Sequence, residues 1–118
     1  MPPMDAASFR VSDQAGSSAD VRILAVYGAI TNDSLGAFQA AVTESNQPRL
    51  IIDMTGVPHV DSMAIGGLVR AYVACQKAGR RLALTGLNHR VKNVLALTGV
   101  EALFEVYPSV SLAEEAMR

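Results

Sequence analysis

Short apolar segments alternate along this chain with segments in which apolar residues recur every three or four positions. Apolar runs bounded by Gly, Pro or polar residues are typical of strands, and the longer period is typical of helices that bury one face. The alternation predicts a single α/β domain with a four- or five-stranded mixed β-sheet covered by about four α-helices. We expect strands around residues 9–11 and at 21–27, 49–54, 81–85 and 104–107. We expect helices from Asp33 or Ser34, from Ser62, from Asn88 and from Ser109. The Gly- and Ser-rich segment 13–20 predicts a turn that joins the first two strands as a hairpin.

The strongest helical pattern extends from Ser62 to Ala78, with Gly79 after it. One stripe of this helix is predicted to face the core, and it contains Ile65, Leu68, Val69, Tyr72, Val73 and Gln76. Gly66 and Gly67 lie one turn inside the helix, where each glycine disfavours the helix by about 1 kcal/mol relative to Ala. Gly67, Arg70, Ala71 and Ala74 leave the opposite face almost bare. A bare face allows close approach of another backbone, either that of a partner or that of a second helix in the same domain.

The length and composition indicate one globular domain. The chain has 118 residues, half of them hydrophobic and 18% charged, so we expect one core over residues 8–118 and a flexible N-terminal tail at 1–7. The longest apolar run, 23–30, is far shorter than the roughly 18 to 20 residues that cross a bilayer, so we expect no membrane insertion. A single cysteine, Cys75, and no leader-like apolar segment near Met1 favour a cytoplasmic location.

The charge is small overall but uneven. The formal net charge of −1 gives no reason to expect a nucleic-acid partner. Between Ser62 and Val100, however, every charged residue is basic. Such a run fits either solvated helix surface or a docking patch.

Ser62 is the position with the clearest candidate chemistry. It follows a loop and precedes the central helix, so we interpret it as the helix N-cap. A phosphate there is favoured by unpaired N–H groups and by the positive end of the helix dipole. It would add about −1.5 to −2 charges beside Asp61 and oppose the docking of a partner. Met63 points away from the apolar stripe, and an exposed thioether suits a protein contact.

Enzyme signatures are missing from the sequence. His59, Asp61 and Ser62 have the residue types of a hydrolase triad, but they lie too close in sequence for the relay, and there is no Gly-x-Ser-x-Gly elbow. No phosphate-binding Gly-rich motif occurs, and two histidines with one cysteine give no zinc-site spacing. We therefore expect no enzyme, no cofactor and no bound metal, although binding of a small molecule or lipid in a core pocket stays open.

Residues 59–66, His-Val-Asp-Ser-Met-Ala-Ile-Gly, resemble the Asp-Ser-Ser-Gly-Leu-Gly segment of STAS domains, the sulfate transporter and anti-sigma factor antagonist family. Residues 50–54 resemble the buried strand before that motif. Residues 91–104 resemble the family's Val-x-x-x-Leu-x-x-x-Gly-Val-x-x-Leu-Phe helix and exit. The resemblance covers roughly residues 8–117.

The resemblance implies a stand-alone antagonist of bacterial partner switching. In that subgroup the unphosphorylated form binds an anti-sigma factor/serine kinase and releases its client, phosphorylation of the residue matching Ser62 abolishes binding, and a PP2C-like serine phosphatase restores it. From the bare helix face and the accessible Met63, we expect the partner contact to include Asp61, Met63, Gly66, Gly67 and Arg70. The alternative is a STAS accessory subunit of an ABC-type lipid transporter that binds its ATPase without regulated phosphorylation.

Two departures from the family pattern stand out. Met63-Ala64 replaces the usual Ser/Thr-Gly pair after the phosphoacceptor. Residues 28–31, Gly-Ala-Ile-Thr, replace the frequent Gly-Glu-Leu-Asp, so an acidic residue expected near the phosphorylation site is missing.

Overall fold

The computed structural model describes residues 9–118, and the predicted tail 1–7 lies outside them. A five-stranded sheet with the order β1-β2-β3-β4-β5 forms the centre, which confirms the predicted α/β class. The strands are β1 (Arg10–Ala15), β2 (Val21–Tyr27), β3 (Arg49–Gly56), β4 (Arg81–Thr85) and β5 (Glu105–Tyr107). The helices are α2 (Leu35–Glu44), α3 (Ser62–Lys77), α4 (His89–Leu97) and α5 (Val110–Ala116), with a short 3-10 helix η1 (Glu101–Leu103).

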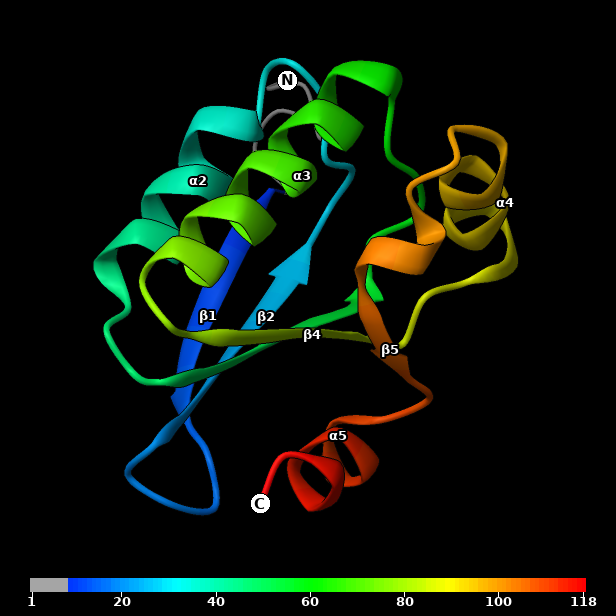
Figure 1. The fold of residues 1–118 in the computed structure, drawn as a ribbon. Helices are drawn as coiled ribbons and strands as arrows, with labels where there is room; N and C mark the ends of the chain where they lie inside the picture. Colours follow the sequence, from blue (N-terminus) through cyan, green and yellow to red (C-terminus); the bar gives the residue numbers. More distant parts are fainter. Residues whose placement is uncertain (1–8) are drawn as a thin grey trace.

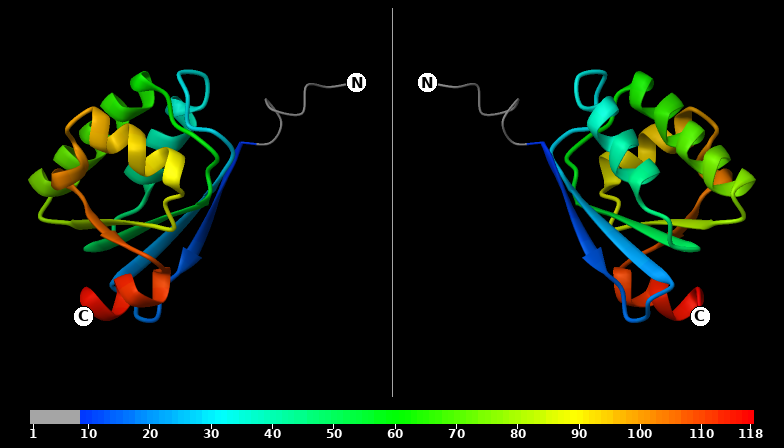
Figure 2. Two further views of the ribbon diagram at one scale, coloured as in Figure 1. Left: turned by 90° about the vertical axis from the view of Figure 1, so that its right-hand side faces the viewer. Right: turned by 90° about the vertical axis from the view of Figure 1, so that its left-hand side faces the viewer.

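The sheet is mixed because only its first pair is a hairpin. β1 and β2 run antiparallel, whereas β2, β3, β4 and β5 pair in parallel. Residues 13–15 belong to β1, so the turn before β2 is shorter than the predicted segment 13–20. Each parallel connection therefore crosses over through a helix or a longer segment. These crossovers place α2, α3 and α4 on one face of the sheet and leave α5 on the other (Figures 1 and 2).

Two hydrophobic clusters lie on the two faces of the sheet. Alternate residues of β3 point to opposite sides, as a strand requires. Ile52 joins the larger cluster under α2, α3 and α4, together with Phe38 and Leu68. Ile51 joins the smaller cluster with Met117 at the end of the chain. No helix among residues 9–118 combines the length and the apolar character needed to cross a membrane.

All four helices begin where the sequence predicts, with α3 starting at Ser62. α2 begins directly after Ser34, although the Ser34 hydroxyl bonds within the preceding loop and does not cap the helix. The Asn88 side chain accepts a hydrogen bond from the N–H of Val91 at 2.8 Å, and the Ser109 hydroxyl accepts one from Leu112 at 3.2 Å. Both residues therefore cap the helices that follow them, α4 and α5.

The buried face of α3 differs from the predicted one. Ile65 and Leu68 are buried as expected, but Val73 is 40% exposed and Gln76 is also exposed. Besides Ile65 and Leu68, the residues that α3 buries are small, namely Ala64, Gly67, Ala71 and Cys75. The physical reason is α2, which packs so closely against α3 that the Leu35 side chain occupies the space a Gly67 side chain would need.

Candidate functional site

The start of α3 is held in place by contacts from two other parts of the chain. The segment after β3 runs beside the segment after β2, where Ile30 pairs with Val60 in an isolated parallel bridge. The N–H of Ile30 donates to the carbonyl of His59, and the N–H of Asp61 donates back to the carbonyl of Ile30, both at 3.2 Å. From the other side, the Asn88 amide donates to the carbonyl of Val57 at 3.2 Å. The segment that leads into α3 is therefore held by hydrogen bonds from the loop after β2 and from Asn88.

Asp61, not Ser62, is the N-cap of α3. Its Oδ1 accepts a hydrogen bond from the N–H of Ala64 at 2.9 Å, while its Oδ2 accepts one from the N–H of Asn32 at 3.3 Å. The prediction that Ser62 caps the helix is thus wrong, because the carboxylate one residue earlier satisfies the first turn. Asp61 also connects α3 to the loop after β2 through the hydrogen bond from Asn32.

Ser62 is the first residue of α3, and its side chain is exposed. Its hydroxyl makes no hydrogen bond within residues 9–118, so it has no part in holding the helix start. Met63, the next residue, is 57% exposed, as predicted. The helix begins with two accessible side chains that the fold itself does not use.

The two glycines of α3 have different surroundings. A Cβ on Gly67 would lie 2.2 Å from Cδ1 of Leu35, so Gly67 is needed for the contact between α2 and α3. A Cβ on Gly66 would meet only Nη1 of Arg70, at an ordinary distance of 3.9 Å. The prediction that Gly67 belongs to a partner contact is therefore wrong, since α2 already covers it. The structure therefore has room for a small side chain at position 66.

The exposed side of α3 forms one continuous row of residues, which we call the α3 ridge. Its members recur every three or four positions and so lie on one helix face. They are Ser62, Met63, Gly66, Arg70, Val73 and Lys77. The ridge brings together four of the predicted site residues, and Asp61 caps its N-terminal end. Val73 and Lys77 were missed: Val73 was assigned to the core stripe, and no motif marks Lys77.

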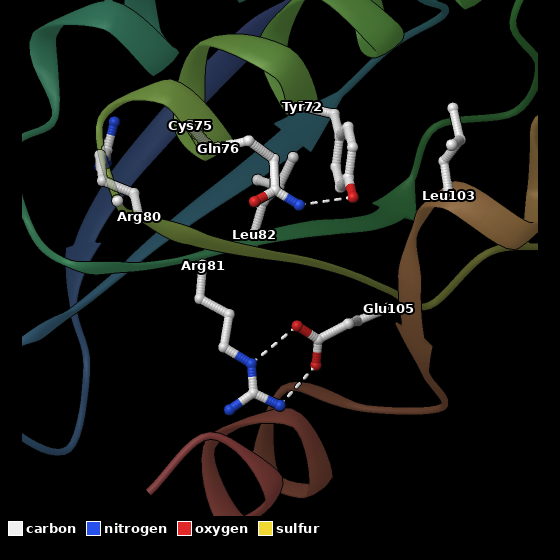
Figure 3. A pocket seen from close by; sticks show the side chains of 9 residues that line it. Tyr72, Cys75, Gln76, Arg80, Arg81, Leu82, Leu103 and Glu105 are labelled. Carbon is white, nitrogen blue, oxygen red and sulfur yellow. Dashed lines mark hydrogen bonds and ion pairs between the residues drawn. The ribbon is translucent and has the colours of Figure 1, made fainter.

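A hollow of about 280 Å³ lies at the C-terminal end of α3, beside Tyr72 and Gln76 (Figure 3). Arg81 donates to both carboxylate oxygens of Glu105 at 2.7 Å, and this pairing lowers the pKa of Glu105. Burial raises the pKa of the Cys75 thiol beside it. The hollow is lined by Tyr72, Cys75, Gln76, Gly79, Arg80, Arg81, Leu82, Leu103 and Glu105. Much of its polar lining is paired internally, and residues 9–118 contain no group of three side chains that could hold a metal ion.

The family is established by a direct match. The model of the STAS domain family matches residues 14–113, which is most of the chain. The protein therefore belongs to the STAS domain family.

Relatives and solved structures agree with this assignment. A curated protein of Thermotoga maritima, named "Putative anti-sigma factor antagonist", is 27% identical over 70 residues, which are 59% of this chain and 62% of that protein. The matched part thus spans less than two thirds of that relative. The crystal structure of an antagonist of the same name from Thermotoga maritima has a TM-score of 0.79 at 22% identity and covers 90% of this chain and 92% of that one. An anti-sigma factor antagonist from Mycobacterium paratuberculosis has a TM-score of 0.76 at 21% identity, with coverages of 91% and 93%. At these identities the solved structures show a shared fold.

Proposed function

We propose that this protein is an anti-sigma factor antagonist that works in the cytoplasm and is switched by phosphorylation of Ser62. The unphosphorylated form binds an anti-sigma factor that is also a serine kinase, and the kinase then releases its client. Phosphorylation of Ser62 by that kinase ends the contact, and a PP2C-like phosphatase reverses the modification.

The observation that carries this proposal is that Asp61 caps α3 and Ser62 does not. Asp61 provides the cap of α3, so the Ser62 hydroxyl is exposed and has no structural task. Replacing that hydroxyl by a phosphate ester leaves the hydrogen bond from Ala64 to Asp61 in place. The fold is therefore compatible with modification at this position.

The helix start also favours the added anion. N–H groups in the first turn of a helix and the positive end of its dipole stabilise a phosphate there. At the same time the phosphate adds about −1.5 to −2 charges next to the Asp61 carboxylate, at the end of the exposed α3 ridge. A partner that covers Ser62 and Met63 would have to desolvate these charges, so its binding is weakened while the protein stays folded.

Phosphorylation is tested by mixing the purified protein and ATP with each serine kinase encoded in the same genome and locating the phosphate by mass spectrometry. We expect label at Ser62 and none in Ser62→Ala. Ser111 is a matched control because it is an exposed serine in the first turn of α5. Ser111→Ala should be labelled as strongly as the parent. Label that persists in Ser62→Ala would contradict the assignment.

The switch is tested by measuring the affinity of the kinase complex for the acidic variants Ser62→Asp and Ser111→Asp. We expect Ser62→Asp to weaken binding at least about fivefold, because a negative charge there opposes docking. Its melting temperature should stay close to that of the parent, since an acid is tolerated in the first turn of a helix. Ser111→Asp should bind normally. A tight complex with a transporter ATPase and no label at Ser62 would instead favour an accessory subunit of an ABC-type transporter.

A further inference from the structure

The basic residues of α3 and α4 lie on exposed surface without acidic neighbours in their own helices. Arg70 and Lys77 lie on the α3 ridge, and α4 exposes Arg90 and Lys92. Neither helix contains an aspartate or a glutamate. Among residues 9–118 the ion pairs are made by other arginines, in β2, β3 and β4. The charges of the α3 ridge are therefore available to a partner.

We propose that the partner surface that docks on the α3 ridge is an acidic protein surface. This deepens the proposed function and rests on it, since it specifies the chemistry of the partner at the same site. Oppositely charged surfaces attract over distances of about 10 Å at moderate salt and mainly speed association. Arg70 and Lys77 lie along one face of α3, so the complementary partner surface carries carboxylates at the positions that face them.

The composition of the α3 ridge favours a protein over a nucleic acid. Val73 lies between Arg70 and Lys77, and Met63 lies nearer the start of the ridge. Both side chains are exposed and offer apolar contact area, which suits the mixed character of a protein interface. The ridge itself contains no aromatic side chain on which a base could stack. The neighbouring Tyr72 ring packs edge-on against Phe104, with 5.6 Å between ring centroids. The net charge of the whole chain is −1, unlike that of a typical nucleic-acid binder.

Gly66 connects this charge pattern to the phosphorylation site. The Arg70 guanidinium extends back along the helix, and its Nη1 lies 3.9 Å from the position that a Gly66 side chain would take. A positive charge is therefore held about one turn closer to Ser62 than the Arg70 backbone is. A phosphate on Ser62 offsets that charge and repels carboxylates of the partner. The same acidic surface that binds the unmodified ridge is repelled from the modified one.

The test compares two charge reversals of equal size, Arg70→Glu and Arg118→Glu. Both arginines are exposed, but Arg118 is at the C-terminus, beside α5 on the opposite side of the sheet (Figure 1). The probe is the kinase that labels Ser62, and association rates are measured by stopped flow at about 50 mM and about 500 mM salt. We expect Arg70→Glu to slow association at least about tenfold at low salt and much less at high salt. Arg118→Glu should change the rate less than about twofold. Melting temperatures check that both variants fold.

The possible outcomes separate this inference from the proposed function. If Ser62→Asp weakens the complex but Arg70→Glu associates as fast as Arg118→Glu, the proposal of an acidic partner surface is wrong. The proposed phosphorylation switch is then retained. If a short DNA duplex binds the parent and is lost in Arg70→Glu while the kinase complex is unchanged, the ridge is a nucleic-acid surface. If Ser62→Asp binds as tightly as the parent, or no kinase labels or binds the protein, the proposed function fails and the acidic partner fails with it.

Discussion

The two adjacent glycines of α3 should respond in opposite ways to the same substitution. Gly66→Ala adds a methyl group in open space near Arg70. Replacing glycine by alanine inside a helix should then stabilise the protein by about 0.5–1 kcal/mol, which corresponds to a rise of about 2–4 °C in melting temperature. Gly67→Ala has the same backbone benefit, but its methyl group would lie 2.2 Å from Cδ1 and 3.0 Å from Cγ of the buried Leu35. Overpacking of a core typically costs about 1–3 kcal/mol, so the net effect should be a loss of up to about 2 kcal/mol.

A double-mutant cycle isolates the contact between Gly67 and Leu35. Leu35→Ala alone should destabilise by about 2–5 kcal/mol, as truncation of a buried leucine does. Gly67→Ala in that background no longer meets a leucine side chain, so it should become stabilising, by about as much as Gly66→Ala. Free energies of unfolding are measured by urea denaturation followed by circular dichroism. Equal shifts for the two glycine variants, or an effect of Gly67→Ala that is independent of Leu35→Ala, would refute the close packing of α2 on α3.

Two further substitutions test the helix start and the distant ion pair. Asp61→Ala removes the acceptor for the N–H groups of Ala64 and Asn32, so it should lower the free energy of unfolding by about 1 kcal/mol, whereas Asp61→Asn should retain most of it. An Asp61→Ala protein as stable as the parent in urea would argue against this cap. Because Arg81 lowers the pKa of Glu105, the pair stabilises the fold above the ordinary carboxyl value of 4.5 and less as the pH falls through the lowered pKa. Glu105→Gln should therefore cost about 0.5–1 kcal/mol at neutral pH, and its difference from the parent should disappear well below pH 4.5, as followed by urea denaturation across the acid range. A difference that persists unchanged in acid would contradict that origin.

The element order could be predicted from the sequence because local signals agree with the tertiary fold. Apolar runs between Gly, Pro and polar residues became β2, β3 and β4 within about two residues of the expected bounds. The face of α3 could not be predicted in the same way. Counting large apolar side chains selected Val73, but the helix is turned so that Gly67 faces α2. Burial of a glycine depends on the neighbouring helix, and periodicity within one segment carries no information about that neighbour.

The candidate site was located from the sequence, but its internal roles were not. Aspartate and serine are about equally good caps, so residues 61 and 62 were indistinguishable as N-caps by local propensity. The choice is made by long-range contacts: the bridge of Ile30 to Val60 brings the loop after β2 alongside, and the N–H of Asn32 then binds Asp61. Only a structure shows which of the two side chains is left free.

The missing acid in the loop after β2 and the basic helix face fit a single explanation. Residues 28–31 contain no carboxylate, and both oxygens of the Asp61 carboxylate already accept backbone hydrogen bonds. The unmodified α3 ridge is therefore positive beyond its capped end, with Arg70 reaching back over Gly66. A phosphate at Ser62 would add about −1.5 to −2 charges beside the Asp61 carboxylate and make this end of the ridge strongly negative, while Arg70 and Lys77 stay positive. Carboxylates on the partner would be attracted by Arg70 and repelled by the added phosphate, which is why the proposed acidic docking surface and the proposed phosphorylation switch fit together.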